Sequence, residues 1–444
     1  MNIKEIINGI AVIIDDEVDK QDSGIFKIRE NIIANNIPVA TYSDVPSTET
    51  VKFLSQAAFV ILDWNFYQDD DLLDDPTERL MLPGLKENKK AQVIEFVKAL
   101  LNEIFIPIFI FTTSPPELVM QSLKEEHVIC EGNPDRIFVK QKNDIKSDEE
   151  LFDTMDEWLK TMPSVYVLKE WEKLANATKT KMFLEWYELS PNWVSVIWKM
   201  IKNDSIENDY EFGTFITKNI VNRMQLFEFD EEYIQGEKSI PKSELLRIIE
   251  GERYQKYDSQ PNQPKQAYTG DLFKCSGKYY LNLRAQCDIS REEDGEYNPD
   301  LYCIKGSKLR DADIIAEDIK LTDSGDLVFS NSKNFSLEDL GQICQDEDRL
   351  LDFNANFKKY RNNMIFYNKG ELLEKKTEAI IACVDNGKYI KFELRKLELK
   401  KFAEIKEKRI GRILPPYITK IQQKFAQHIV REGIMPIPEE LFLE

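Results

Sequence analysis

The stretch AVIIDDE, residues Ala11–Glu17, joins an apolar run directly to three acids. A short apolar run of this kind is typical of a strand buried in a parallel sheet. In an open α/β sheet, ligands bind beyond the carboxyl ends of the strands, so Asp15 and Asp16 are expected at the mouth of a site. Adjacent carboxylates repel each other unless they share a cation, and oxygen ligands are those that Mg²⁺ prefers. The stretch therefore predicts a buried strand that ends at a magnesium site.

Three later apolar runs end in polar side chains in the same way. They are Phe59–Asp63 (FVILD), Pro107–Thr113 (PIFIFTT) and Ile137–Lys140 (IFVK), and Pro38–Tyr42 adds a further short strand. Polar or helical segments follow the runs, which is the alternation expected of a doubly wound parallel α/β sheet with five strands. In chain order, the strand ends present two acids, one acid, a hydroxyl and an ammonium group.

Helical periodicity fills the intervals between these strands. The predicted helices are Ile25–Asn35, Ser47–Ala57, Ala91–Asn102 and Asp148–Met162. Before the third of them the chain inserts an acidic loop, Gln68–Lys90. Loops of this length are often functional, so the loop is interpreted either as a solvated insertion or as a gate over the site.

The strand-end side chains resemble those of the receiver domain of two-component response regulators, over roughly the first third of the chain. The resemblance implies a flavodoxin-like fold in which Asp15 and Asp16 bind Mg²⁺. It implies that Asp63 accepts a phosphoryl group from a sensor histidine kinase. It further implies that Thr112 is the hydroxyl that reports the phosphate, and that Lys140 contacts the phosphate.

Two details refine what the resemblance implies. The backbone carbonyl of Asn65, two residues after the acceptor, would join Asp63 as a metal ligand, and Thr113 is the alternative switch hydroxyl. Mg²⁺ would remove the charge repulsion that makes a carboxylate a poor nucleophile toward phosphorus, and Lys140 would neutralise the charge that remains. The chain departs from the family at Gln141, where proline is common, and at Phe138, which stands two residues before the lysine. These departures concern the signalling surface more than the phosphoryl chemistry.

Two alternatives keep the fold but change the chemistry. A pseudo-receiver would retain these residues as a scaffold without phosphoryl transfer. A stand-alone aspartyl-phosphate hydrolase is disfavoured, because that family has an acid two residues after the nucleophile and Asn65 stands there.

Length indicates the number of domains, and net charge limits the classes of binding partner that are expected. A chain of 444 residues predicts two or three domains. The net charge of −20 removes any global attraction to DNA or to an anionic membrane, and no basic helix-turn-helix output module is present. Neither DNA binding nor membrane association is therefore expected.

The cysteines and histidines exclude several kinds of site. The six cysteines are scattered without a CxxC pair, and only two histidines are present. A zinc site or a histidine-based triad is therefore not expected. With no signal peptide and no long apolar run, the cysteines are interpreted as free thiols of a cytoplasmic protein.

The chain is predicted to have three regions, residues 1–162, 163–260 and 261–444. The middle region is helical across Trp171–Phe229, and its aromatic residues recur at helical spacing. Core packing explains that spacing better than stacking on nucleic-acid bases does, because the region is not basic. A helical linker that forms a homodimer or docks on the first domain is expected.

The third region predicts an α+β domain built as a small β-rich module, such as a partly closed barrel. Its predicted strands are Asp271–Lys274, Tyr279–Ala285, Leu301–Ile304, Asp326–Phe329, Met364–Asn368, Ala379–Val384 and Tyr389–Lys396. Residues Asp385–Gly387 (DNG) predict a hairpin between the last two strands. A charged helix is expected over Leu397–Arg409, and an amphipathic helix over Tyr417–Arg431.

The third region contains two groups of residues that are candidate sites. The pair Cys287 and Asp288 could suggest a catalytic cysteine, but no nearby histidine supports this, so a buried cysteine and a turn aspartate are favoured. The best basic patch would be formed by Arg412, Lys420, Lys424 and Arg431. A solvated helix face is favoured there over a surface that binds nucleic acid or an acidic partner.

No enzyme motif follows the first domain. Overall, the chain resembles the regulator components of bacterial anti-phage two-component-like systems such as Detocs. That resemblance implies a phosphate buffer, or sink, in antiviral defence or stress signalling, which would not be an enzyme beyond self-dephosphorylation. The alternative is an effector enzyme of unknown type in the C-terminal half, switched on by phosphorylation of Asp63.

Overall fold

The computed structural model describes the greater part of the chain. The described residues are 6, 9–66, 76–129, 136–145, 147–204, 208–235, 240–257, 264–289, 297–309, 319–321, 327–329, 366–368, 371–373, 377–385 and 388–430.

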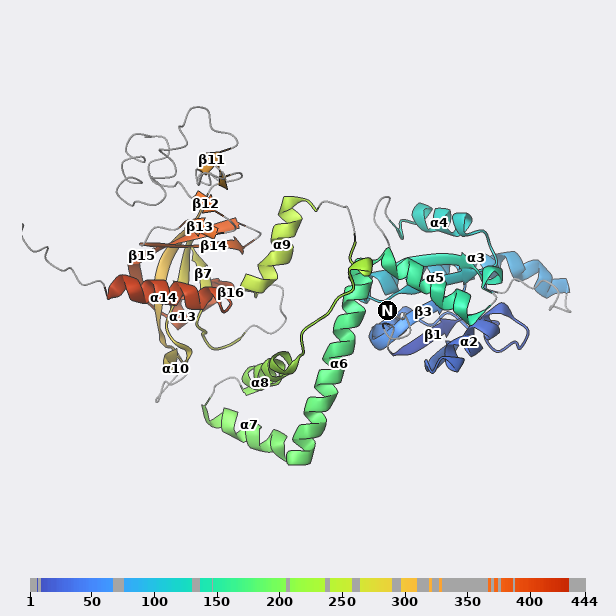
Figure 1. The fold of residues 1–444 in the computed structure, drawn as a ribbon, viewed down its shortest axis with the longest axis horizontal. Helices are drawn as coiled ribbons and strands as arrows, with labels where there is room; N and C mark the ends of the chain where they lie inside the picture. Colours follow the sequence, from blue (N-terminus) through green and yellow to red (C-terminus); the bar gives the residue numbers. More distant parts are fainter. Residues whose placement is uncertain are drawn as a thin grey trace, which may run out of the picture. The chain divides into compact units, whose positions relative to one another are not determined.

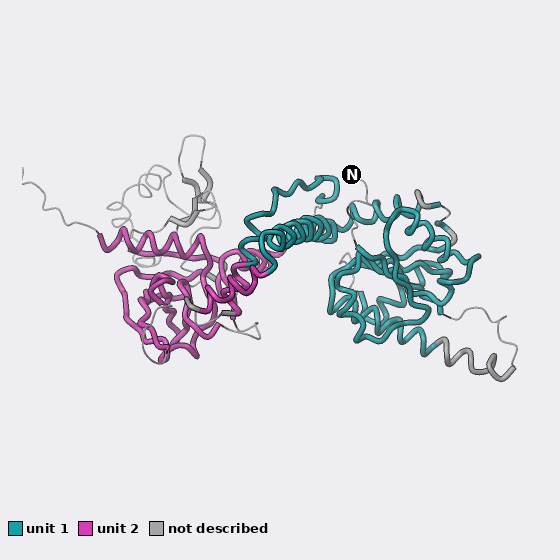
Figure 2. Tube along the Cα trace, turned by 90° about the horizontal axis from the view of Figure 1, so that it is seen from below, with its two compact units in different colours: residues 1–191, 216–238 teal, residues 192–215, 239–444 magenta. Residues whose placement is uncertain are grey.

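The chain forms two compact units, and each unit consists of two separate segments (Figure 2). Unit 1 comprises residues 1–191 and 216–238, and unit 2 comprises residues 192–215 and 239–444. The predicted middle region, residues 163–260, is thus divided between the two units.

Unit 1 is built on a five-stranded parallel sheet in the order β2-β1-β3-β4-β5 (Figure 1). Its strands are β1 (Ile10–Ile14), β2 (Val39–Tyr42), β3 (Ala57–Leu62), β4 (Ile108–Thr112) and β5 (Ile137–Gln141). The predicted α/β class and the number of strands are confirmed for this unit.

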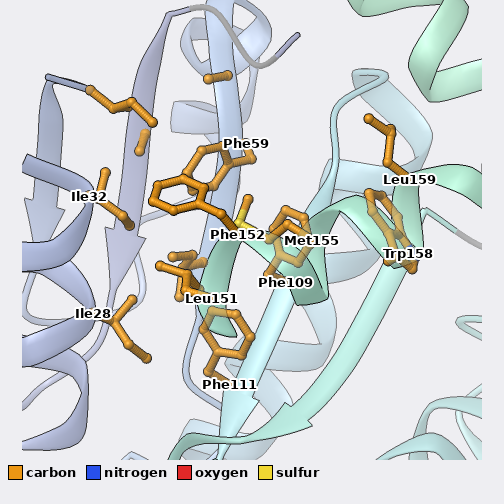
Figure 3. Packing of buried hydrophobic residues seen from close by; sticks show 14 of the residues in the cluster. Ile28, Ile32, Phe59, Phe109, Phe111, Leu151, Phe152, Met155, Trp158 and Leu159 are labelled. Carbon is orange, nitrogen blue, oxygen red and sulfur yellow. The ribbon is translucent and has the colours of Figure 1, made fainter. Parts of the chain in front are cut away.

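Helices cover both faces of this sheet. They are α2 (Gly24–Ala34), the 3₁₀ segment η1 (Thr48–Gln56), α3 (Pro76–Glu103), α4 (Pro116–Glu125), the 3₁₀ turn η3 (Lys142–Asp144) and α5 (Asp148–Lys160). Helices α2 and α5 pack into one buried cluster, and η1, α3 and α4 pack into the other. Figure 3 shows the first cluster, in which Ile28 and Ile32 of α2 and Trp158 of α5 lie among the phenylalanines of the sheet.

Burial on both faces explains the uninterrupted apolar run of β1. Ala11 and Ile13 lie in the α2 and α5 cluster, whereas Val12 and Ile14 lie in the opposite one. Side chains of a strand alternate between its two faces, so every position must be apolar when both faces are covered. The strand can therefore become polar only where it leaves the sheet, at Asp15.

The acidic loop predicted at Gln68–Lys90 is wrong over most of its length. Helix α3 begins at Pro76 and continues unbroken to Glu103, so it includes the stretch from Pro76 to Lys90. The prediction failed because Pro83 and Gly84, which usually interrupt helices, lie inside this helix. The aspartates at 69–71, 74 and 75 lie outside the described residues.

The core of unit 1 includes a segment from beyond its sheet. Helix α6 (Pro163–Leu189) follows α5 directly, and the 3₁₀ turn η4 (Glu231–Tyr233) brings Tyr233 back to this core. The ring of Tyr233 stacks on that of Tyr166 at 4.7 Å, and its hydroxyl donates to Asp156 Oδ1 at 2.6 Å. The backbone N–H of Asp230 donates to the Tyr166 hydroxyl at 2.8 Å. Tyr233 is fully buried as a result.

Unit 2 is built on a seven-stranded antiparallel sheet in the order β14-β15-β9-β8-β7-β16-β6. Its strands are β6 (Tyr254–Lys256), β7 (Asp271–Cys275), β8 (Lys278–Asn282), β9 (Asp300–Lys308), β14 (Glu378–Val384), β15 (Lys388–Lys401) and β16 (Arg409–Ile413). Two short hairpins accompany the sheet, formed by β10 (Ile319–Leu321) with β11 (Leu327–Phe329) and by β12 (Phe366–Asn368) with β13 (Glu371–Leu373). Buried clusters line both faces of the sheet.

The remaining helices follow the prediction in part. They are α7 (Trp193–Asp204), α8 (Asn208–Arg223), α9 (Lys242–Arg253), α10 (Gln286–Ile289), α13 (Phe402–Ile405) and α14 (Tyr417–Ile429), with the 3₁₀ turn η6 (Lys406–Lys408). The predicted hairpin is confirmed, because Val384 of β14 pairs with Lys388 of β15. Helix α14 confirms the amphipathic helix, and its residues Ile418 and Ile421 are buried against the sheet.

The charged helix predicted over Leu397–Arg409 is wrong. Strand β15 continues through this region to Lys401, and Leu397 pairs with Ile304 of β9. In the sequence LELKK, leucines alternate with charged residues, which is also the period of a strand. Pairing with the long strand β9 decides between the two periods here, and this pairing is not visible locally in the sequence.

Candidate functional site

Three acids meet at one edge of the parallel sheet. Asp15 directly follows β1, and Asp63 directly follows β3, which is the neighbour of β1 in the sheet. Carboxylate oxygens of Asp15, Asp16 and Asp63 all lie within 4.8 Å of one another. Asp15 and Asp63 are buried, and Asp16 is half-buried. The sequence prediction that these three side chains converge is confirmed.

The backbone holds the two buried acids in place. The N–H of Asp15 donates to the carbonyl of Tyr42, and the N–H of Asp63 donates to the carbonyl of Ile14, both at 2.9 Å. These bonds carry the sheet pairing one residue past the strands. Asp15 Oδ1 also accepts from the N–H of Glu17 at 2.8 Å. The carboxylates are therefore fixed by the sheet and by the turn that follows it.

The lysine at this site is Lys142 and not Lys140. Lys142 Nζ lies 2.7 Å from Asp15 Oδ2 and 3.2 Å from Asp63 Oδ2, and the side chain is buried. Lys140 Nζ instead donates to Thr154 Oγ1 of α5 at 2.7 Å. The prediction placed the wrong lysine among the acids.

The position of the end of β5 explains this correction, because alternation would place Lys140 and Lys142 on the same side. Lys140 lies on the same face of β5 as Phe138, which packs against the α5 residue Trp158, so the Lys140 amine also meets α5. Lys142 is the first residue after β5, as Asp15 and Asp63 are the first residues after β1 and β3. Strand β5 continues past its last apolar residue. That continuation is the feature that would identify Lys142 as the lysine at the strand end.

Thr112, the last residue of β4, is fully buried and is held by Asn65. Asn65 Nδ2 lies 2.8 Å from Thr112 Oγ1, 2.9 Å from Ser114 Oγ and 3.1 Å from Thr113 Oγ1. A carboxamide has two hydrogens, so it donates to two of these three oxygens at a time. Thr112 Oγ1 also accepts from the N–H of Ser114 at 3.0 Å. The side-chain role of Asn65 was missed, because the sequence interpretation assigned only its backbone carbonyl.

Burial dominates the electrostatics of the site. The pKa of Asp63 is raised to about 7, by burial first and to a smaller extent by the Asp15 carboxylate, while Lys142 opposes the rise. Burial also raises the pKa of Asp15, again against Lys142. The two carboxylates in turn hold the pKa of Lys142 above its usual value in spite of burial. The Lys142 ammonium contacts two of the three clustered carboxylates, and the raised pKa values of these two acids show that the site favours additional positive charge.

One expectation for the C-terminal region, the burial of Cys287, is wrong. Cys287 is exposed rather than buried, and its Sγ lies 3.5 Å from Asp288 Oδ1. Arg412 lies on β16, before α14, and its guanidinium is 4.3 Å from the ring centre of Tyr268. Arg431 lies outside the described residues.

No helix in the described part of the chain has the length and hydropathy needed to cross a membrane. Comparison of the chain with protein-family models, with curated proteins and with solved structures finds no match.

Proposed function

We propose that unit 1 is a receiver-like domain with a flavodoxin-like fold, in which Asp63 accepts a phosphoryl group from a sensor histidine kinase. The observation that carries the proposal is the meeting of Asp15, Asp16 and Asp63 with the ammonium of Lys142 at the carboxyl edge of the sheet. The strand order β2-β1-β3-β4-β5 supports it, because this is the order of flavodoxin-like folds, which bind ligands at this edge.

The donor set fits a magnesium ion. Carboxylate oxygens of Asp15, Asp16 and Asp63, with the backbone carbonyl of Asn65, would hold the ion. Asp63 Oδ1 is buried and has no hydrogen-bond partner among the described residues, as expected of an oxygen kept for a cation. When bound, the ion would supply positive charge that offsets repulsion between the carboxylates and an incoming phosphoryl group.

Asp63 provides the nucleophile of the proposed reaction. One of its carboxylate oxygens forms a bond to phosphorus, while the P–N bond of the donor phosphohistidine breaks and its electron pair leaves with the imidazole. The attacking carboxylate must be ionised, and burial raises its pKa to about 7. The ammonium of Lys142, 3.2 Å from Asp63 Oδ2, favours the ionised form and lies where it can neutralise a phosphoryl oxygen.

Thr112 is the candidate reporter of phosphorylation. Its hydroxyl can donate a hydrogen bond to a new anionic oxygen, but it also accepts hydrogen bonds from Asn65 Nδ2 and from the N–H of Ser114. A phosphoryl group on Asp63 would therefore compete for the orientation of this hydroxyl. A switch of this kind shifts the balance between two arrangements of the β4–α4 segment.

The experiment is intact-mass measurement after incubation with acetyl phosphate and Mg²⁺. The wild-type protein should gain one phosphoryl group, and Asp63→Asn should gain none. The matched control is Asp19→Asn, an exposed aspartate in the loop that follows the acidic pair, which should gain the group as the wild type does. Absence of a gain from acetyl phosphate and from an autophosphorylated cognate kinase would contradict the proposal and favour a pseudo-receiver scaffold.

The further role as a phosphate sink in anti-phage or stress signalling rests on the overall resemblance alone. It requires that the chain either holds the phosphoryl group or hydrolyses it without producing an output. The decay of the phosphorylated mass with time measures this. An enzymatic activity of unit 2 that appears on phosphorylation and is lost as the phosphorylated mass decays would favour the effector enzyme instead.

A further inference from the structure

A cavity of about 300 Å³ lies beside the residues that follow Asp63. Its walls come from the segment after β3, from α3, and from the β4–α4 turn with the first turns of α4. The size is at the lower end of the range for cavities that bind small organic molecules, which is about 300–1,000 Å³.

The walls combine an apolar surface with hydroxyl and ammonium groups. Trp64 and Phe66 are buried and supply aromatic surface, while Ser114 and Ser122 supply hydroxyls. Lys90 Nζ lies 6.0 Å from the ring centre of Trp64, so its charge stands over the aromatic wall. None of the nine described residues that line the cavity carries a carboxylate, although the chain contains 79 acids. A cavity of this composition favours an anion with an apolar body.

The cavity shares two residues with the switch. Asn65 and Ser114 line the cavity, and their side chains are hydrogen-bonded to each other. The Asn65 carboxamide and the Ser114 backbone N–H both donate to the Thr112 hydroxyl oxygen. A molecule that accepts a hydrogen bond from the Asn65 carboxamide would compete with the Thr112 hydroxyl for the same donors. Occupancy of the cavity and the state of Thr112 are therefore linked, and this linkage acts in both directions.

We propose that this cavity binds a small organic anion, an aromatic or other apolar body with one carboxylate or phosphate group, and that its occupancy biases the Thr112 switch. The second part rests on the proposed function of Asp63, whereas the first part does not. The aromatic wall would contact the body of the ligand. Lys90 and the serine hydroxyls would contact its charged group.

Binding is tested on the full chain with benzoate and phenyl phosphate as probes and benzamide as the uncharged analogue. The titrations use Asp63→Asn protein in EDTA, so that neither Mg²⁺ nor the phosphoacceptor can bind the anion. Both anions should bind, and benzamide should bind at least about threefold more weakly. The tighter of the two anions identifies the charged group that the site prefers.

Three variants place the binding in this cavity. Ser122→Trp fills it and should abolish binding of both anions. Lys90→Ala should weaken both by about three- to fivefold while leaving benzamide unchanged. Lys98→Ala, on the same helix but paired with Glu126, is the matched control and should leave all affinities unchanged. Retained affinity in a folded Ser122→Trp protein, or equal affinity for benzoate and benzamide, would overturn the proposed site.

The link to the switch is tested separately, on the wild type. Benzoate at saturating concentration should change the rate at which acetyl phosphate phosphorylates Asp63, and Lys90→Ala should need more benzoate for the same change. An unchanged rate, with binding confirmed in Asp63→Asn, would overturn the link. Failure of phosphorylation itself would concern the proposed function only, because the binding titrations do not require it.

Discussion

The ammonium of Lys142 contacts two of the three clustered acids, Asp15 and Asp63. We expect Lys142→Ala to slow phosphorylation of Asp63 by acetyl phosphate at least about tenfold, because the charge next to the transferred group is lost. Lys140→Ala is the matched control, since Lys140 bonds Thr154 instead. It should change the rate by less than about threefold. Intact-mass time courses measure both, and a larger effect of Lys140→Ala would return the role to that residue.

Burial of the ionised Asp63 carboxylate should lower the free energy of unfolding of the metal-free protein. Its carboxyl has a pKa near 3.8 when unfolded and about 7 when folded, so the folded chain binds the proton more tightly. Stability contributed by this group is therefore present at low pH and is lost as the pH rises toward 7. This titration depends on burial first and on Lys142 and Asp15 second, and a hydrogen bond from the Asn65 backbone also opposes the rise in the pKa of Asp63.

The variant Asp63→Asn has no such titration. In EDTA we expect it to be more stable than the wild type by about 2 kcal/mol at alkaline pH, with the advantage vanishing near the unfolded pKa. Chemical denaturation at a series of pH values measures the difference. An advantage that stays constant with pH would show that burial of the charge is not its cause.

At the scale of single residues, the sequence identifies the clustered acids correctly, but it does not identify Lys142 or the role of the Asn65 side chain. Asp15, Asp16 and Asp63 follow short apolar runs that are typical of buried parallel strands, so their common edge can be inferred. The choice between Lys140 and Lys142 depends on where β5 ends, and a strand end is set by pairing with β4 rather than by the local sequence. The reach of the Asn65 side chain to three hydroxyls depends on packing between neighbouring strands, which the sequence does not display.

Among the elements of unit 2, β9 and β15 show how closely two strands are fitted. A Cβ on Gly306 of β9 would lie 2.6 Å from a ring carbon of Phe392, its partner on β15. Gly306→Ala should therefore lower the melting temperature of the full chain by several degrees, since the buried ring has to move.

A second glycine provides a control of opposite sign. A Cβ on Gly213 of α8 would meet nothing within 4 Å, and alanine has the higher helix propensity. Gly213→Ala should therefore leave stability unchanged or raise it by up to about 1 kcal/mol. Thermal denaturation compares the two variants. Equal losses would mean that the close approach of Phe392 is not what makes glycine necessary at 306.

The errors at the scale of elements have one cause. Local signals favoured a loop at Pro83 and Gly84 and a helix at Leu397, yet the chain forms a helix in the first case and a strand in the second. Propensity is a weak preference that packing overrides. The strands with strong apolar runs, such as β1, β3 and β4, were predicted correctly because burial on two faces leaves little choice of residue.

In the whole molecule, the two segments of each unit are separated in the sequence by a segment of the other unit. Residues 216–238 belong to unit 1, where Tyr233 is buried against Tyr166. We expect a fragment of residues 1–191 to melt at least about 5 °C below a fragment of residues 1–238, because the shorter one leaves this aromatic site unfilled. Calorimetry of the two fragments measures the difference.

The full chain supplies the control for that comparison. Tyr233→Phe should cost only about 1 kcal/mol, because the ring stays and only the hydrogen bond to Asp156 is lost. Equal melting of the two fragments would contradict the assignment of this segment to unit 1. The sequence could not predict the assignment, because three contiguous regions are the simplest division and the return of Tyr233 is a long-range contact.

The return of Tyr233 also sets an order of events during synthesis. Residues 192–215, which belong to unit 2, leave the ribosome before residues 216–238, which complete unit 1. Tyr233 therefore cannot cover the Tyr166 side chain until the ribosome has added Tyr233 and this residue has cleared the exit tunnel. The first unit reaches its final form only after translation of the second has already begun, so folding of this chain cannot proceed strictly from one end to the other.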